Sequence, residues 1–67
     1  MIEIRLNDER RQLDEGTTLA ALVESLGQPP GALATAVNGH FVPRTQRADC
    51  RLCDGDVVMT FQAITGG

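Results

Sequence analysis

The spacing of apolar residues changes from strand-like to helical and back along this chain, and this change restricts the fold. From Ile2 to Leu6, apolar residues alternate with charged ones, the period-two pattern of a strand with one buried face. Between residues 19 and 26 they instead recur at the spacing of an amphipathic helix. Residues 57–62 return to a strand-forming composition. One helix between strands predicts an α+β domain, with the helix packed on one face of a sheet.

Two turn signals divide the strand-forming segments into hairpins. The polar triplet Asn7-Asp8-Glu9 ends the first strand and allows a short return strand over Arg10–Leu13. Asn38-Gly39 is the stronger signal, and it predicts a hairpin between a strand at residues 33–37 and another at residues 40–42. We therefore expect a hairpin on each side of the helix, followed by one final strand.

The helix has clear start and stop signals. Thr17 or Thr18 can cap its first turn, Gly27 suits a left-handed residue after its end, and Pro29-Pro30 prevents its continuation. The segment 45–52 shows no clean period, so the sequence predicts no regular element there.

The chain is long enough for one core and is acidic overall. Its 67 residues fit a single domain, and with Phe41 and Phe61 as the only aromatic residues the core must be aliphatic. Nine acidic residues against six arginines, for a net charge of −3, argue against binding to a phosphate backbone. No apolar run approaches the roughly 20 residues that span a bilayer, and the N-terminal residues do not resemble a secretory signal. We expect neither a nucleic-acid nor a membrane partner, and a cytoplasmic location.

Few residues of the expected domain suggest chemistry. His40 is the only histidine and lies in a predicted turn, so a solvated hairpin residue is the simpler interpretation. Cys50 and Cys53 have the C-x-x-C spacing, but a closed zinc site needs four ligands and a redox motif opens a helix after a strand. They are interpreted as ordinary thiols, with a redox-sensitive surface pair as the alternative. Asp54-Gly55-Asp56 indicates a tight turn more than a calcium loop. The sequence thus predicts neither a catalytic set nor a metal site.

The C-terminal pair Gly66-Gly67 is the most distinctive feature of the chain. Neither residue has a Cβ atom, which leaves the terminal carboxylate unhindered on a backbone of wide conformational freedom. Residues 63–67 follow the last expected strand and can extend about 15 Å, at roughly 3.3 Å per residue, far enough to enter another protein's active site. A frayed terminus is the other interpretation, and the residues alone leave both open. The predicted organisation is a folded domain over residues 1–62 and a flexible tail over residues 63–67.

Three segments carry a resemblance to a known family. They are Ala36–Arg44, with the sequence AVNGHFVPR, then Asp54-Gly55-Asp56, and then Phe61–Gly67, with the sequence FQAITGG. Together with the length and the order of elements, they make the whole chain similar to the thiamin biosynthesis sulfur carriers of the ThiS family, members of the ubiquitin-like β-grasp group. The resemblance implies a mixed sheet of four to five strands with one main helix packed on one face. Thr65 stands where the family usually has alanine, and the cysteine pair does not belong to the family pattern.

This resemblance implies a function for the tail and partners for the domain. An adenylyltransferase similar to ubiquitin-activating enzymes would use ATP to convert the carboxylate of Gly67 into an acyl-adenylate. Sulfur that originates from cysteine through a desulfurase would replace AMP, and thiazole synthase would take up the resulting thiocarboxylate. Gly66, Thr65 and Ile64 would form the tail that carries Gly67. The chain would then be a co-substrate of these enzymes, with no catalytic residue, cofactor or metal of its own.

The last strand leaves open which of its faces is buried. Bare hydrophobicity places Val57, Met59 and Phe61 in the core. Counting back from the two terminal glycines onto the ubiquitin pattern instead buries the alternate residues, namely Val58, Thr60 and Gln62. We favour the second arrangement because it explains why both faces of one strand carry apolar residues. It leaves Met59 and Phe61 exposed as an apolar patch that can bind a partner.

Three other functions remain open at this stage. The small subunit of molybdopterin synthase also presents a terminal thiocarboxylate, although its members tend to be longer. A ubiquitin-like protein modifier would form isopeptide bonds, but with no lysine in the sequence it could not build chains on itself. The third is a β-grasp interaction module in which the tail has no function.

Overall fold

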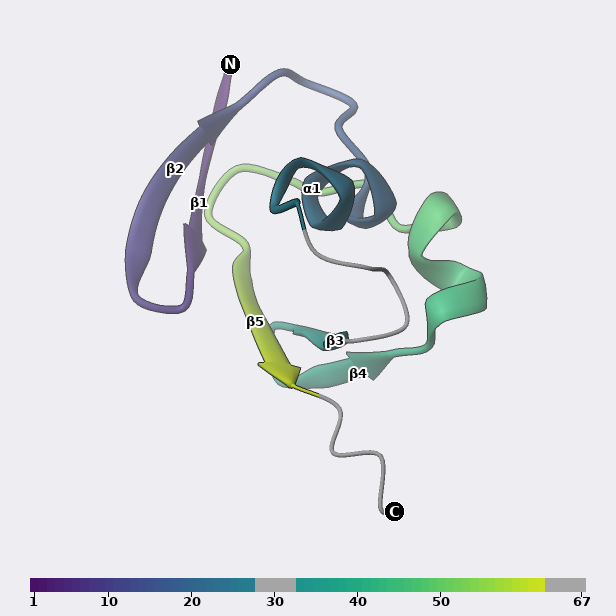
Figure 1. Cartoon of the computed structure of the whole chain (residues 1–67). Helices are drawn as coiled ribbons and strands as arrows, with labels where there is room; N and C mark the ends of the chain where they lie inside the picture. Colours follow the sequence, from purple (N-terminus) through teal and green to yellow (C-terminus); the bar gives the residue numbers. More distant parts are fainter. Residues whose placement is uncertain (28–32, 63–67) are drawn as a thin grey trace, which may run out of the picture.

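The computed structural model describes residues 1–27 and 33–62, and in these ranges it shows a mixed five-stranded sheet, one α-helix and one 3-10 helix (Figure 1). In chain order the elements are β1 (Ile2–Leu6), β2 (Glu9–Leu13), α1 (Leu19–Ser25), β3 (Leu33–Val37), β4 (His40–Val42), η2 (Arg44–Asp49) and β5 (Val57–Gln62). The strands lie in the order β2-β1-β5-β3-β4, with β1 parallel to β5 and the other neighbours antiparallel. This confirms the predicted α+β fold, a mixed sheet with one main helix.

Two-residue turns close both hairpins. Asn7 and Asp8 have φ angles of 48° and 69°, and the two residues of Asn38-Gly39 have 51° and 82°. Positive φ at both central residues is typical of a type I′ turn, whose twist matches that of the flanking strands. The turn prediction for Asn38-Gly39 is confirmed. The prediction that Glu9 belongs to the first turn is wrong, because two residues suffice to reverse the chain and Glu9 already pairs with Leu6.

Helix α1 starts and ends where its capping signals predict. Of the two candidate threonines, Thr18 is the N-cap, and its Oγ1 accepts a hydrogen bond of 3.2 Å from the amide of Ala21. After the helix, Gly27 has a φ of 75°, and its amide donates to the carbonyl of Glu24 at 3.2 Å. The expected stop at Pro29-Pro30 falls outside the described residues. In the part of the chain that the structure describes, no helix has both the length and the apolar character needed to cross a membrane.

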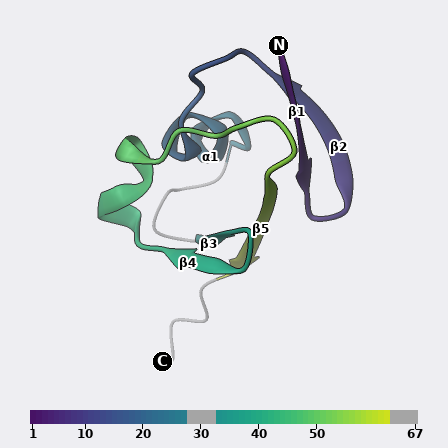
Figure 2. The same ribbon diagram turned by 180° about the vertical axis from the view of Figure 1, so that it is seen from behind.

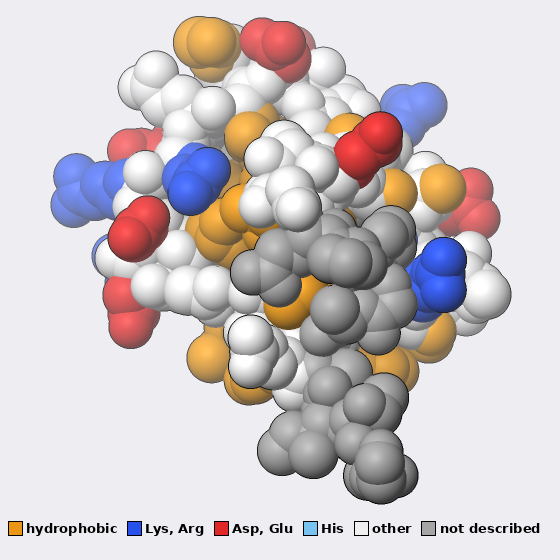
Figure 3. Space-filling model, in the orientation of Figure 1, with side chains coloured by type: hydrophobic (Ala, Val, Ile, Leu, Met, Phe, Trp, Pro, Cys, Tyr) orange, Lys and Arg blue, Asp and Glu red, His pale blue; other side chains and the backbone are white. Residues whose placement is uncertain are grey.

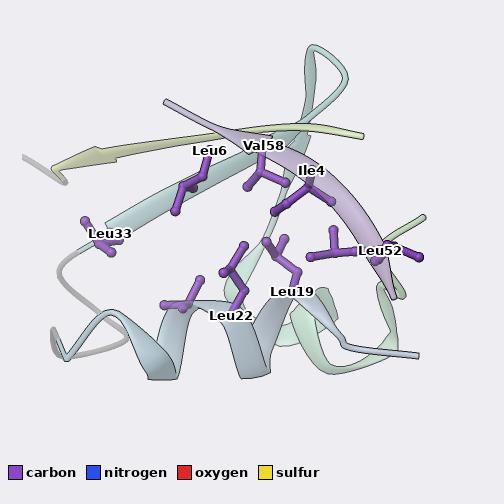
Figure 4. Close-up of a cluster of buried hydrophobic side chains, with 9 residues drawn as sticks. Ile4, Leu6, Leu19, Leu22, Leu33, Leu52 and Val58 are labelled. Atoms are coloured by element: carbon purple, nitrogen blue, oxygen red, sulfur yellow. The ribbon is translucent and has the colours of Figure 1, made fainter. Parts of the chain in front are cut away.

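The core is aliphatic, as the composition predicts, and lies between α1 and the sheet. Charged side chains stand out at the rim of the face in Figure 3, whereas Figure 4 shows the buried side chains converging from β1, β5 and α1. Among the residues that the structure describes, the buried apolar ones are Ile2, Ile4, Leu6, Leu19, Leu22, Val23, Leu33, Leu52 and Val58. Burying a side chain of this kind is worth roughly 1.5–3 kcal/mol. Because so short a helix is marginal by itself, α1 depends on this contact with the sheet.

The 3-10 helix η2 corrects the prediction that residues 45–52 hold no regular element. Its polar sequence, RTQRAD, has no apolar period to reveal it, yet one of its arginines is buried. Arg47 is 4% exposed; its Nε donates to Oγ1 of Thr35 at 3.0 Å, and its Nη2 donates to the carbonyl oxygen of Leu33. In both ribbon views (Figure 1 and Figure 2), η2 lies beside α1, on the side away from the β1–β2 hairpin. Arg47 therefore ties η2 to β3.

Candidate functional site

Strand β5 fixes the point from which the chain continues toward its C-terminus. It lies at the centre of the sheet, paired with β1 at its start and with β3 from Val58 onward. The final pair joins Gln62 to Leu33, so the last described residue is held by the sheet. The predicted tail over residues 63–67 lies outside the described residues. The roles proposed for its members therefore stay predictions, and these members are Ile64, Thr65, Gly66 and Gly67.

The two faces of β5 differ in burial. Val58 is fully buried, whereas Val57, Met59 and Phe61 are 40%, 43% and 48% exposed. The arrangement drawn from the ubiquitin pattern is correct in placing Met59 and Phe61 on the outer face of the sheet, away from the core. The alternative prediction, in which hydrophobicity alone places Val57, Met59 and Phe61 in the core, is wrong, because Val58 is the residue that faces the helix.

The prediction that Val58, Thr60 and Gln62 all face the core holds only in part. Thr60 is half-buried and Gln62 is exposed. At Thr60 the side-chain hydroxyl accepts a hydrogen bond of 2.7 Å from Nδ2 of Asn7 at an exposed site, and Gln62 is the last residue of β5. The pattern drawn from ubiquitin therefore predicts the burial of Val58 but not that of the two residues toward the end of the strand.

Strand β4 adds a further large apolar side chain to the outer face. Phe41 is 68% exposed and pairs with Ala36, which pairs on its other side with Met59. Directly paired residues have their side chains on the same face of a sheet. We call Phe41, Val57, Met59 and Phe61 the outer apolar strip. Sequence reasoning missed Phe41, although the two-residue turn after β3 fixes its register.

The predicted tight turn before β5 is confirmed, and it joins β5 to β1. Oδ1 of Asp54 accepts a hydrogen bond of 2.8 Å from the amide of Glu3, and the amide of Gly55 donates to the carbonyl of Glu3 at 2.8 Å. Oδ2 of Asp56 accepts from the amide of Cys53 at 2.8 Å. Gly55 has a φ of 88°, which glycine adopts without strain. Both carboxylates thus serve to bind backbone amides.

Two asparagines from the hairpin turns hold β5 from opposite sides. Oδ1 of Asn38 accepts from the amide of Val57 at 2.9 Å, and its Nδ2 donates to Oδ1 of Asp56 at 3.0 Å. Nδ2 of Asn7 donates to Oγ1 of Thr60 at 2.7 Å, and its Oδ1 accepts from the amide of Thr60 at 3.0 Å. The sequence predicts both turns but not this second role, because the bonded residues are 19 and 53 positions away in the chain.

The two cysteines lie on the segment between η2 and the turn before β5. Cys50 has extended backbone angles, and its carbonyl accepts a hydrogen bond of 2.8 Å from the amide of Leu19. The amide of Leu52 likewise donates to the carbonyl of Thr17 at 2.9 Å. Both thiols are free; that of Cys50 is half-buried and that of Cys53 is exposed. A backbone tied to the start of α1 in this way is unlike the helix start of a redox C-x-x-C motif.

We expect Cys53 to be alkylated faster than Cys50 in the folded protein. Burial, together with the negative charges of Asp56 and Cys53, raises the pKa of the Cys50 thiol and so lowers its thiolate fraction. Because the thiolate is the reactive form, iodoacetamide at about pH 8 should label Cys53 about three- to tenfold faster. Peptide mass spectrometry measures both rates. The difference should disappear in urea, and equal rates in the folded protein would contradict the burial of Cys50.

The single histidine is a solvated hairpin residue, as the sequence predicts. His40 is exposed and begins β4 directly after the turn. Across the two described ranges, no three side chains of His, Cys, Asp or Glu come together in a way that could hold a metal ion. The outer apolar strip and the sequence that follows β5 are the features that point to a function.

The fold and these two features together define a class of protein. A mixed five-stranded sheet packed on one helix, whose central last strand leads to two terminal glycines, is the arrangement of a ubiquitin-like β-grasp carrier. The family model of the ThiS family matches residues 4–67. The chain belongs to this family, the sulfur carriers of thiamin biosynthesis.

Individual relatives agree with this assignment. The sulfur carrier protein ThiS of Escherichia coli strain K12 is 39% identical over 66 residues, covering 98% of this chain and 100% of that protein. The crystal structure of the thiamine biosynthesis protein ThiS from Geobacter metallireducens matches with a TM-score of 0.84 at 20% identity, covering 98% of this chain and 100% of that one. An NMR structure of a thiamine biosynthesis protein from the same organism gives 0.76 at 20% identity, covering 98% and 88%. The resemblance drawn from the sequence is confirmed.

Proposed function

We propose that this chain carries sulfur as a thiocarboxylate on Gly67. The observation that carries the proposal is that the match to the ThiS family runs through residue 67 and so includes both terminal glycines. The sheet holds the chain as far as Gln62, and the five residues that follow can extend about 15 Å. In this function the domain offers its partners a fixed surface, and the tail offers them a reactive end.

The proposed chemistry takes place at the terminal carboxyl group. A carboxylate oxygen of Gly67 attacks the α-phosphate of ATP, pyrophosphate leaves, and an acyl-adenylate forms. A sulfur nucleophile, written here as hydrosulfide, then attacks the carbonyl carbon. AMP leaves, a proton is released, and the thiocarboxylate remains. Adenylation is needed because a carboxylate oxygen is a poor leaving group, whereas AMP is a good one. Gly66 and Gly67 suit this step because neither carries a Cβ that would block a narrow active-site channel.

We assign the catalytic groups and the ATP contacts to partner enzymes. An adenylyltransferase similar to ubiquitin-activating enzymes would form the acyl-adenylate, a cysteine desulfurase would be the origin of the sulfur, and thiazole synthase would consume the thiocarboxylate. The chain itself would need no bound cofactor. Met59 and Phe61 stand on the face opposite the core, so the outer apolar strip gives these partners a surface to bind.

Intact-mass spectrometry tests this proposal. The full chain is incubated with ATP, its cognate adenylyltransferase and a source of sulfide, and its mass is followed over time. We expect a gain equal to the replacement of one oxygen by sulfur, located on Gly67 by fragmentation and absent when ATP is omitted. A carrier whose mass stays constant beside an active adenylyltransferase would refute the proposal.

Replacing Met59 and Phe61 together with serine should weaken partner binding while the domain stays folded. Both side chains are about half exposed and lie outside the core, so their loss should cost about 2 kcal/mol and lower the melting temperature by roughly 8–16 °C, with the buried core intact. If they are central contacts, the carrier concentration needed for half-maximal adenylation should rise about tenfold or more. Ala48→Ser, at an exposed position on η2, is the control. An unchanged half-maximal concentration in the double variant would place the partner surface elsewhere.

A further inference from the structure

Two arginines face each other on the outer face of the sheet. Arg5 pairs with Arg10 across the β1–β2 hairpin and with Val57 on its other side, and both arginines are exposed. Arg5 lies between the buried residues Ile4 and Leu6, so its side chain points away from the core. Like charges directly opposite each other across a strand pair are destabilising. The fold therefore gains nothing from an arginine at both positions.

Neither arginine of this pair forms an ion pair with another described residue. In residues 1–27 and 33–62 there is one ion pair, Arg11 to Glu9 at 3.9 Å, and the strand register places it on the other face of the hairpin. Glu3 lies in the same surface hollow of about 460 Å³ as the arginine pair, but it forms an ion pair with neither. The chain as a whole has a net charge of −3. With two arginines and one glutamate, the lining of this hollow has a net charge of +1 and is a local positive region on an acidic molecule.

This positive region borders the outer apolar strip at the end away from the tail. Val57, the neighbour of Arg5, begins the strip, and Phe61 lies near the other end of β5. The distance along the strand between them is about 13 Å, and from Phe61 to Gly67 the chain can extend about 20 Å. One partner can therefore bind the arginines and the strip while it holds the terminal carboxylate.

We propose that Arg5 and Arg10 orient the carrier on the adenylyltransferase by pairing with carboxylates at one end of an apolar groove on that enzyme. This inference rests on the proposed function and adds its orienting contact. Apolar contact alone does not fix the direction in which the strip lies in a groove. A charge at one end does, because the reversed orientation would place two guanidinium groups away from their partners. The bound direction then sends the tail toward the active site.

The surroundings of the pair favour a protein surface over other anionic partners. Nucleic-acid binding requires a wide basic patch, and this chain has six arginines against nine acids. Recruitment to an anionic membrane usually requires clusters of about four to eight basic residues. Two arginines beside an apolar strip instead match an interface with an apolar centre and a charged rim.

Charge reversal tests the inference. Arg5→Glu combined with Arg10→Glu is compared with Arg44→Glu combined with Arg51→Glu, which makes the same change in net charge at other exposed positions. Affinity for the adenylyltransferase is measured by calorimetry at low and at high NaCl concentration. We expect the first variant to bind about tenfold or more weakly at low salt, and to bind more tightly at high salt than at low salt, the reverse of the salt dependence expected for the unchanged carrier. The second variant should bind within about twofold of the unchanged carrier.

A neutral variant shows that a loss of binding is not a loss of folding. Arg5→Gln combined with Arg10→Gln removes the repulsion, so its melting temperature should equal or slightly exceed that of the unchanged carrier while its affinity falls. If the unchanged carrier gains sulfur and the charge-reversed variant binds the enzyme equally well, this inference is overturned and the proposed function stands. An unchanged carrier that is never adenylated overturns both. Binding to phosphatidylserine vesicles that depends on the two arginines, with enzyme affinity unaffected by reversal, would assign the pair to a membrane and overturn the inference.

Discussion

Deleting Gly67 is expected to abolish conversion of the carrier to its thiocarboxylate. The new terminal carboxylate would belong to Gly66 and would fall about 3.3 Å short of the position in which the partner presents ATP. Because a misplacement of about 1 Å can cost about 100-fold in rate, we expect the deleted carrier to gain sulfur at least that much more slowly. Intact-mass spectrometry under the conditions used for the unchanged chain measures the difference.

The same deletion should leave the fold intact. Within residues 1–27 and 33–62, all the buried apolar residues lie between Ile2 and Val58, so we expect the core that they form to stay intact. The melting temperature should therefore change by less than about 2 °C. A large decrease would show that the end of the chain has a structural role. A deleted carrier that still gained sulfur at the normal rate would place the acceptor on another residue.

Leu19→Ala is expected to destabilise the domain strongly. Leu19 is fully buried in the cluster that Figure 4 shows between α1 and the sheet. Truncating a buried leucine costs about 2–5 kcal/mol. A domain of 67 residues has a total free energy of unfolding of about 3–10 kcal/mol, so the loss takes much of it. Urea denaturation followed by circular dichroism should show a midpoint lower by about 2 M or more.

Leu26→Ala makes the same chemical change at a half-buried position and is the matched control. It should cost about 1 kcal/mol, because less of its side chain leaves contact with the core. If the two leucine variants lost equal stability, the burial of Leu19 would not be the reason that the helix stays packed on the sheet. A loss below about 1 kcal/mol at Leu19 would contradict the dependence of the fold on this cluster.

Local patterns account for the parts of the fold that the sequence predicts correctly. The turn at Asn38-Gly39, the cap at Thr18 and the alternation from Ile2 to Leu6 each act over a few neighbouring residues. The face of β5 is a different case, since Val57 and Val58 are identical side chains with opposite burial. Hydrophobicity could not distinguish them, and the register relative to the terminal glycines did.

Features formed by contacts between distant residues were not predictable in this way. Arg47 is buried because Thr35 and Leu33 supply acceptors 12 and 14 positions earlier in the chain, so its own polar neighbours gave no sign of it. Phe41 joins the outer apolar strip because Ala36 lies between β4 and β5. The acceptor role of Gly67 is a prediction from the sequence motif, since that residue lies outside the described ranges.

Because β1 pairs with β5, the sheet cannot close until the last strand has been synthesised. Arg5 and Val57, which pair in this sheet, are 52 positions apart, and contacts so distant in sequence form late in folding. A polypeptide terminated before β5 would therefore lack both a closed sheet and the two glycines. An activating enzyme that requires the assembled surface would then not adenylate such incomplete chains.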